Sequence, residues 1–507
     1  MLNTQQSNWS LKQDVTAKQL LAALSETGSL EKDEVITRSV TLLDDPDHAL
    51  WLSGQILIRS KDNQLNLCSG EATQQVEQVS AKARFWWELP DSELQKKVKA
   101  VIDLRALLPQ VEFTLATQSL AIRNDDEKIV LRATITQISA NQEAGRLFIR
   151  FEPLRGYNKA LNGALEACSK LLDQQLEDAS LQVMIRLSGF MADVKQPSKQ
   201  FGIGAEETVE ESVRQMSLHM LKIARDNEQG VIDDIDTEFL HQYRVSLRKT
   251  RSLINLMKKA FPAELHANLK QQLADLAGKT NDLRDLDVFL LSREYYGQML
   301  PENFETGFNK LFSLIGKDRE KARKQVKTSF SSAAHDKLFN DVMETLGQPP
   351  VFETGFARQP VFKAACKKIM RRYEKIRMLG IAIDDSTPDE EVHELRIECK
   401  KLRYMMEFFA ELFDKKRIKS LIKALKGLQT ILGDFNDYSV QKEFLADYGS
   451  RHSKQADLAA AINGLIAVLH QKQLHERTRV QQAFATFNEE SVVREFNDLF
   501  AQQAEAK

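Results

Sequence analysis

The stretch that decides the fold reads His241-Gln-Tyr-Arg244-Val-Ser-Leu-Arg248-Lys249-Thr-Arg251, and it recurs 152 residues later as His393-Glu-Leu-Arg396-Ile-Glu-Cys-Lys400-Lys401-Leu-Arg403. On an α-helix each residue turns by about 100°, so side chains at offsets 0, 3, 7 and 10 fall within an arc of roughly 80°. Each copy therefore predicts a helix with one cationic stripe. The first stripe consists of His241, Arg244, Arg248 and Arg251, and the second of His393, Arg396, Lys400 and Arg403.

The repeat continues beyond the motif without a gap. Residues 241–288 and 393–440 share eleven identities in 48 aligned positions, among them Leu269 with Leu421 and Asp285 with Asp437. Chance would produce only a few. A period of 152 residues is far too long for a solenoid, so the pattern predicts one domain built from two similar halves.

A change in sequence pattern separates two regions. Residues 1–200 alternate short strand-like runs with turns, and the sequence from about 205 to 500 is helix-like with few glycines. We expect halves of about 205–345 and 355–500 in the helical region. In the first repeated helix, one apolar face is predicted to pack against the core. It is formed by Tyr243, Leu247, Ile254 and Met257.

The first 200 residues predict an antiparallel, strand-rich α+β domain. Two stretches are predicted to be helical, Ala17–Leu24 and Tyr157–Leu176. The predicted strands are Glu34–Leu43, Gln55–Ser60, Gln64–Cys68, Ala83–Leu89, Val111–Arg123, Lys128–Ile138 and Arg146–Pro153.

The overall composition does not identify a ligand, but it does indicate the cellular compartment. The net charge is −2, from 70 basic and 72 acidic side chains, so the chain as a whole is not a basic nucleic-acid binder. Four scattered cysteines without metal-ligand spacing favour a reducing compartment. No run of about 18 apolar residues and no signal peptide is recognisable. We expect a cytoplasmic protein without membrane insertion.

The charges are strongly uneven along the chain. Residues 241–251 hold four cations and no acid, 363–377 hold seven cations and one acid, and 415–426 hold six cations and no acid. A cationic helix face is most often simply solvated, but the recurrence of this one and its preference for arginine favour phosphate or carboxylate binding. Nucleic-acid binders usually add aromatic side chains for base stacking, and only Tyr404 lies near the stripes. The pattern therefore favours a polyanion without bases.

Residues of about 205–500 resemble the conserved histidine α-helical domain, or CHAD, family. The resemblance rests on the duplicated motif, on Asp282-Leu-Arg-Asp285-Leu-Asp-Val-Phe and on Leu432-Gly-Asp434-Phe-Asn-Asp437. It implies two pseudo-symmetric four-helix bundles with a basic channel between them that binds inorganic polyphosphate. We expect binding without hydrolysis, and an association with polyphosphate granules in the cell. Asp285 and Asp437 are expected to orient arginines through salt bridges. Carried over by position, the phosphate-binding residues would be the two stripes together with Lys249 and Lys401, and the surface would extend to Arg319, Arg323, Lys327, Lys367, Lys368, Arg371 and Arg372.

Residues 1–200 resemble a CYTH, or triphosphate tunnel, domain more weakly. Three segments carry this resemblance: Asp44-Asp-Pro-Asp47 with the following Leu57-Ile-Arg59, the late strand Arg146–Pro153, and Pro197-Ser-Lys199. Active members begin with Glu-x-Glu-x-Lys, because hydrolysis needs carboxylates that hold Mg²⁺ or Mn²⁺.

The residues at the acidic positions of that family have changed. Asn8-Trp-Ser-Leu-Lys12 keeps only the lysine, Phe148 and Arg150 replace two acids ahead of Glu152, and Thr134–Gln137 replaces another. We therefore expect a degenerate tunnel domain that is not an enzyme and holds no metal. Two alternatives stay open: a metal-dependent triphosphatase that uses Glu88 and Glu152, and an RNA-binding scaffold. If the stripe histidines bind phosphate as cations, affinity should rise below about pH 6.5.

Overall fold

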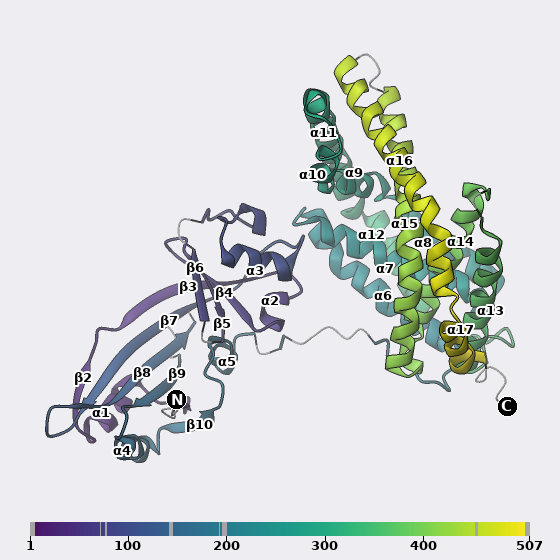
Figure 1. The fold of residues 1–507 in the computed structure, drawn as a ribbon. Coiled ribbons are helices and arrows are strands. Elements are labelled where there is room, and N and C mark those ends of the chain that lie inside the picture. The colour runs from purple at the N-terminus through teal and green to yellow at the C-terminus, as the bar shows by residue number, and fades with distance from the viewer. Residues whose placement is uncertain are drawn as a thin grey trace. The chain divides into compact units, whose positions relative to one another are not determined.

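The protein consists of two structural units, seen in a computed structural model that describes residues 6–70, 72–76, 79–140, 145–191, 193–194, 200–384, 386–451 and 455–501. The units comprise residues 1–197 and 198–507. The first is a curled antiparallel sheet with short helices, and the second is built from helices (Figure 1). The predicted α+β class is confirmed.

Among the described residues of the first unit, ten strands form one sheet. Its order is β10-β1-β9-β8-β7-β3-β4-β5-β6, β2 pairs with β7, and the recorded strand pairs are antiparallel. The strands are β1 (Ser7–Leu11), β2 (Ser29–Lys32), β3 (Ile36–Asp44), β4 (Gln55–Ser60), β5 (Leu65–Ser69), β6 (Ala72–Val76), β7 (Leu108–Arg123), β8 (Ile129–Ser139), β9 (Arg146–Pro153) and β10 (Leu172–Leu176).

Helices cover both faces of this sheet. Helices α1 (Ala17–Ser25) and α4 (Asn158–Cys168) share one apolar cluster with strands β7, β8 and β9. Helix α5 (Leu181–Leu187) packs on a second cluster that contains Phe113 and Phe148, and we call this side of the sheet the α5 face. A third cluster joins α2 (Ala49–Leu52), α3 (Glu93–Ile102) and the segment that leads into η1 (Trp86–Glu88).

Two of the predicted elements in this unit are wrong. The aromatic run Ala83–Leu89 forms the single turn η1 rather than a strand, because the Glu88 carboxylate accepts hydrogen bonds from the amides of Arg84 and Phe85 at 2.7 and 3.1 Å. The predicted helix Tyr157–Leu176 ends at Cys168, and its last five residues form β10, which pairs with β1 at the edge of the sheet. A local side-chain bond in the first place, and a distant strand edge in the second, outweighed residue propensity.

The second unit is helical over its described residues. Its α-helices are α6 (Val209–Ile232), α7 (Thr237–Leu256), α8 (Ala263–Gly278), α9 (Asn281–Leu291), α10 (Arg293–Gly297), α11 (Glu305–Phe330), α12 (Ala333–Gly347), α13 (Val361–Ala382), α14 (Asp389–Phe408), α15 (Lys415–Arg451), α16 (Ala456–Phe487) and α17 (Glu490–Phe496). Short turns complete it, namely η2 (Lys258–Ala260), η3 (Glu302–Phe304), η4 (Ala410–Leu412) and the terminal η5 (Asn497–Ala501).

The duplication inferred from sequence is visible in the helix boundaries. Helices α7 and α14 begin and end 152 residues apart, as do the turns η2 and η4, and α6 and α13 begin at the same offset. Equivalent residues also meet: the amide of Val209 donates to the Gln359 carbonyl at 3.0 Å, and the amide of Val361 donates to the Glu207 carbonyl at 2.8 Å. Such reciprocal bonds between equivalent positions indicate a local pseudo-twofold axis.

One helix differs between the halves. The first half breaks into α8 and α9 at Lys279 and Thr280, whereas the second half continues through the equivalent residues as the single helix α15. Thr280 is fully buried and has a backbone outside the helical region, with ψ of 6°. At the break the Ala277 carbonyl accepts bonds from the Thr280 amide and hydroxyl, and also from Arg244 of the first stripe at 3.3 Å.

The cysteines and the helices give no sign of disulfides or membrane spans in the described part of the chain. All four cysteines are free thiols, and Cys168, Cys366 and Cys399 are buried. Burial raises the pKa of the Cys168 thiol to about 11. Among the described helices, none combines the length and apolar composition needed to cross a membrane.

Candidate polyanion-binding surface

The two repeated helices pack against each other, with their predicted inner faces buried. Tyr243, Leu247 and Ile254 of α7 are fully buried, as are Leu395 and Leu402 of α14. The register predicted from the spacing is therefore confirmed. It places the stripe residues away from the core.

The two stripes meet where α7 and α14 contact. Arg248 Nε donates to the Tyr404 hydroxyl at 3.2 Å, and Lys249 Nζ lies 3.6 Å from Glu407 Oε2, so both contacts join one half to the other. Lys400 occupies the position equivalent to Arg248. Burial, and then the charges of Arg248 and Arg396, lower the pKa of Lys400 to about 8. The stripes therefore form one basic surface across the pseudo-twofold axis.

Arg244 is held at the break between α8 and α9. Its Nη1 donates to the Ala277 carbonyl at 3.3 Å, to Thr280 Oγ1 at 2.8 Å and to Asn281 Oδ1 at 2.8 Å. None of these acceptors is a carboxylate, so the guanidinium keeps its net charge. The broken helix thus fixes this side chain without neutralising it.

His241 is half-buried beside several cations. Burial lowers the pKa of the ring, the charges of Arg284, Arg248 and Arg244 lower it further, and Glu238 opposes them. In the free protein the imidazole consequently gains its proton only below its ordinary range. The sequence led us to expect that polyanion affinity rises below about pH 6.5. At His241 this rise in affinity is expected at lower pH.

Arg284 belongs to the first stripe in space although the sequence comparison did not select it. It lies on α9, acts on the pKa of His241, and burial lowers its own pKa. The residue at the equivalent position of the second half is Asn436, so a search for duplicated cations passes over it. The sequence did offer one indication that Arg284 belongs to the site, because it precedes Asp285 in the repeated acidic motif.

The second stripe is balanced differently. Arg396 Nη2 lies 3.5 Å from Asp437 Oδ1, the salt bridge expected from the sequence. Arg403 pairs with Glu407 at 2.7 Å and donates to Gln429 Oε1 at 3.3 Å, while His393 is exposed. Asp285, the counterpart of Asp437, has no partner within salt-bridge distance among the described residues. Burial raises its pKa and the nearby Arg244 opposes that rise.

Lys401 and Arg372 face a different partner. Both bind Glu398, which is 2% exposed, with Lys401 Nζ 2.9 Å from the carboxylate and Lys375 Nζ 3.4 Å from it. Burial raises the pKa of Glu398, but the bonds from Lys401 and Arg372 outweigh it and leave the pKa lowered. These two predicted phosphate ligands are therefore partly neutralised between α13 and α14.

A second basic group lies near the end of α7. Lys368 of α13 donates to the Leu256 carbonyl at 2.6 Å. Burial and then the charges of Arg372, Arg371, Lys258 and Lys259 lower the pKa of Lys368 to about 8. Lys258, Lys259 and Arg371 are exposed, so this group can extend the basic surface as the sequence predicted for α13.

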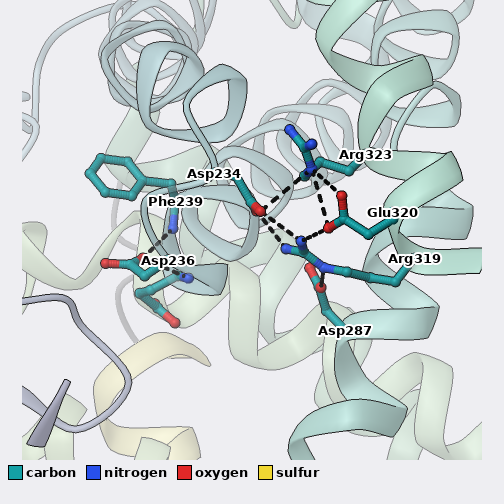
Figure 2. Close-up of polar contacts among 8 residues, drawn as sticks. Asp234, Asp236, Phe239, Asp287, Arg319, Glu320 and Arg323 are labelled. Atoms are coloured by element: carbon teal, nitrogen blue, oxygen red, sulfur yellow. Dashed lines mark hydrogen bonds and ion pairs between the residues drawn. The ribbon is translucent and has the colours of Figure 1, made fainter. Parts of the chain in front are cut away.

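Arg319 and Arg323 take part in a closed ion network (Figure 2). Arg319 contacts Asp234 at 2.5 Å, Asp287 at 2.9 Å and Glu320 at 3.2 Å, and Arg323 contacts Glu320 at 3.1 Å and Asp234 at 3.6 Å. The network ties the loop before α7 to α9 and α11. Its carboxylates neutralise the two arginines, so we assign them a structural part.

The remaining predicted residues are dispersed. Lys327 and Lys367 are exposed, and Arg251 is half-buried with an Nε atom that has no hydrogen-bond partner among the described residues. That nitrogen is itself buried, so it is not exposed to a ligand oxygen in this structure.

The first unit places its altered tunnel positions together. Asn8, Thr134, Phe148 and Arg150 line one cavity on the α5 face. Glu88, a ligand in the triphosphatase alternative, instead caps η1, and Glu152 accepts a bond from Gln6 at 3.4 Å. In the described residues no three His, Cys, Asp or Glu side chains lie close enough to hold a metal ion. The Pro197-Ser198-Lys199 segment lies outside the described residues.

Comparison with known proteins identifies the helical unit. Two curated relatives, both uncharacterized proteins of Mycobacterium tuberculosis (strains CDC 1551 / Oshkosh and ATCC 25618 / H37Rv), are 24% identical over 241 residues. The alignment covers 43% of this chain and 45% of each relative, so the chain spans less than half the length of the relatives it matches.

Two solved structures are similar to part of this chain. The CHAD domain of the plant Ricinus communis is 22% identical, with a TM-score of 0.46 over 56% of this chain and 93% of that one. PptA from Streptomyces chartreusis is 13% identical, with a TM-score of 0.43 over 55% and 100%. The curled sheet of the first unit is compatible with the CYTH-like domain expected from the sequence. The CHAD domain family model matches residues 215–446, and this part of the chain is therefore a CHAD domain.

Proposed function

We propose that the helical unit binds linear inorganic polyphosphate along the joined stripes and does not cleave it. The observation that carries the proposal is the meeting of Arg248 with Tyr404 and Lys400 across the axis, which turns two short stripes into one basic surface. Each stripe follows about 15 Å of helix, a length that suits a run of phosphates better than a single acidic group. CHAD domains are in general associated with polyphosphate binding.

The pseudo-twofold axis also favours this ligand over nucleic acid. Equivalent residues meet on the axis, so a chain that enters from either end meets a histidine and a row of cations in the same order. The halves differ at Lys400 and Asn436, which correspond to Arg248 and Arg284. Linear polyphosphate is identical in both directions, whereas a single nucleic-acid strand has chemically different ends. Tyr404, the aromatic residue near the stripes, is buried and already bonded to Arg248, which leaves little aromatic surface for base stacking.

The triphosphatase alternative has weaker support. The positions where the tunnel family has metal-binding acids hold Asn8, Phe148 and Arg150, and Glu88 is engaged as a helix cap. Oxygen-rich ligand sets are what Mg²⁺ and Mn²⁺ require. We therefore place the activity in the helical unit and describe it as binding.

Equilibrium titration of the full chain with fluorescently labelled long-chain polyphosphate tests the proposal. Affinity should be high at low salt and fall steeply as salt is added, because exposed charges contribute much of the binding energy. Polyphosphates of graded length should bind more tightly until the chain covers both stripes. Binding that is equally tight for tripolyphosphate and for long chains would contradict a surface that spans two halves.

Lys400 predicts a loss of affinity at alkaline pH. Its pKa in the free protein is lowered to about 8, and a bound polyanion would raise it. Affinity should therefore fall as pH rises from the free towards the bound pKa of Lys400, at higher pH than any contribution from the histidines. The Lys400→Arg variant keeps its charge throughout and should show a smaller fall. Binding curves at a series of pH values check this, and identical profiles for the two proteins would remove Lys400 from the site.

A further inference from the structure

The cavity on the α5 face has the composition of a small binding site. It has a volume of about 220 Å³ and lies between strands β1, β8, β9 and β10 and helix α5. Its walls are mainly apolar, with Trp9, Phe148, Leu176, Ala179 and Met184. Polar side chains line one part of it.

The strand register gathers these polar side chains in one place. Asn8 pairs with Arg150 across β1 and β9, and Arg150 pairs with Thr134 across β9 and β8, so the three residues form one row. Thr136 lies two residues from Thr134 on the same face of β8. The row combines one guanidinium, one amide and two hydroxyls.

Arg150 has donors to spare. Its Nε donates to Asn8 Oδ1 at 3.2 Å, and no carboxylate lies within salt-bridge distance of it among the described residues. Among the described residues that line the cavity it is the one charged side chain. A guanidinium remains protonated at any ordinary pH and presents its terminal nitrogens as a fork suited to a carboxylate. The side chains that line the cavity therefore carry a net charge of +1. This charge matches a monoanion and is too small to balance a triphosphate.

The cavity volume limits the size of the ligand. A volume of about 220 Å³ is smaller than most sites for drug-sized ligands. It has room for an organic acid on the order of ten non-hydrogen atoms. The apolar walls require that most of that molecule be hydrocarbon.

We propose that the N-terminal unit binds a small monocarboxylic acid, with the carboxylate on Arg150 and an aliphatic or aromatic body against Trp9, Phe148 and Met184. Asn8 orients the guanidinium, and the hydroxyls of Thr134 and Thr136 donate to the second carboxylate oxygen. The site is independent of the polyphosphate surface and needs no metal.

Ligand-observed NMR on the full chain with benzoate, hexanoate and benzyl alcohol tests this. Benzoate or hexanoate should bind at a single saturable site with a dissociation constant of about 1 mM or tighter, and the uncharged alcohol should bind far more weakly. Arg150→Gln should weaken binding about tenfold or more, while the matched change Arg155→Gln, in the exposed turn after β9, should leave it unaltered. Absence of saturable binding by either acid would overturn the proposal.

A second variant guards against loss of folding. Ala179→Met places a larger apolar side chain in the cavity and leaves Arg150 in the sequence, and it should strongly weaken benzoate binding while the far-UV circular dichroism spectrum stays unchanged. Tripolyphosphate added in excess should not displace benzoate, because its site is predicted in the other unit. Displacement by tripolyphosphate, or undiminished binding by Arg150→Gln, would show that the cavity is not a carboxylate site. Neither result depends on whether the helical unit binds polyphosphate.

Discussion

Replacing Arg244, Arg248, Arg396 and Arg403 together by alanine should weaken long-chain polyphosphate binding by about 100-fold or more at low salt. A charge-assisted hydrogen bond to phosphate contributes about 1 kcal/mol at a partly exposed position, and four add to about 4 kcal/mol, or roughly 1,000-fold. Shared contacts among neighbouring arginines reduce that sum. Anisotropy titrations of the two proteins at several salt concentrations measure the loss, and the salt dependence of the variant should be shallower.

A matched control separates the stripes from net charge. The variant Lys310→Ala, Lys324→Ala, Lys337→Ala, Arg494→Ala removes the same charge from exposed positions outside the stripes, and it should bind within about threefold of the wild type. If the two quadruple variants lose affinity equally, the ligand senses overall charge and the stripe surface is not its site.

Arg319→Ala should destabilise the helical unit by about 3–5 kcal/mol. Asp287 is 2% exposed and forms a salt bridge with Arg319 at 2.9 Å. The variant therefore leaves a buried carboxylate without its cation. Burial raises the pKa of Asp287, and Arg319 opposes that rise. The loss should shrink in mild acid, where Asp287 is protonated and the buried charge disappears. Urea unfolding followed by circular dichroism measures the change.

Two further variants identify the cause. Arg323→Ala should cost only about 1 kcal/mol or less, because its partners Asp234 and Glu320 keep their contacts with Arg319. Adding Asp287→Asn to Arg319→Ala should recover part of the lost stability by removing the unpaired charge. A double variant as unstable as Arg319→Ala alone would show that lost packing, and not the buried carboxylate, determines the cost.

The helical unit was the more predictable of the two because its signal is periodic and repeated. The spacing of Arg244 and Arg248 fixed the outer face of α7, and Tyr243 and Leu247 fixed its buried face. The same offset then located α14. Duplication acts as an internal check, since a chance pattern would not recur in register over whole helices.

The strand-rich unit was less predictable where individual hydrogen bonds, and not residue propensities, decide the structure. Ala83–Leu89 has the aromatic composition of a strand, but the Glu88 side chain closes it into a turn. The segment from Leu172 to Leu176 resembles the end of a helix until β1, far away in sequence, offers it an edge. The partner of β10 cannot be read from a local window, and the Glu88 cap, although local, is a side-chain bond that residue propensities do not include.

The candidate site was only partly predictable, because charge in the sequence does not reveal partners in space. In the sequence Arg319 and Lys401 look as cationic as Arg248. In the structure Asp287 of α9 neutralises Arg319, and Glu398, one turn away on α14, neutralises Lys401. Arg284 lies beside His241 but has no duplicated counterpart, so the symmetry that revealed the stripes also concealed it.

The most direct test of the central claim is competition at the stripe surface between polyphosphate and single-stranded RNA at equal phosphate concentration. The account predicts that unlabelled polyphosphate displaces labelled polyphosphate from the full chain far more effectively than RNA does. It predicts that the advantage is lost in the variant that lacks Arg244, Arg248, Arg396 and Arg403. If RNA competes as well as polyphosphate, the surface recognises only phosphate charge, and if RNA competes better, the surface prefers nucleic acid. Either result would show that the proposed function is wrong.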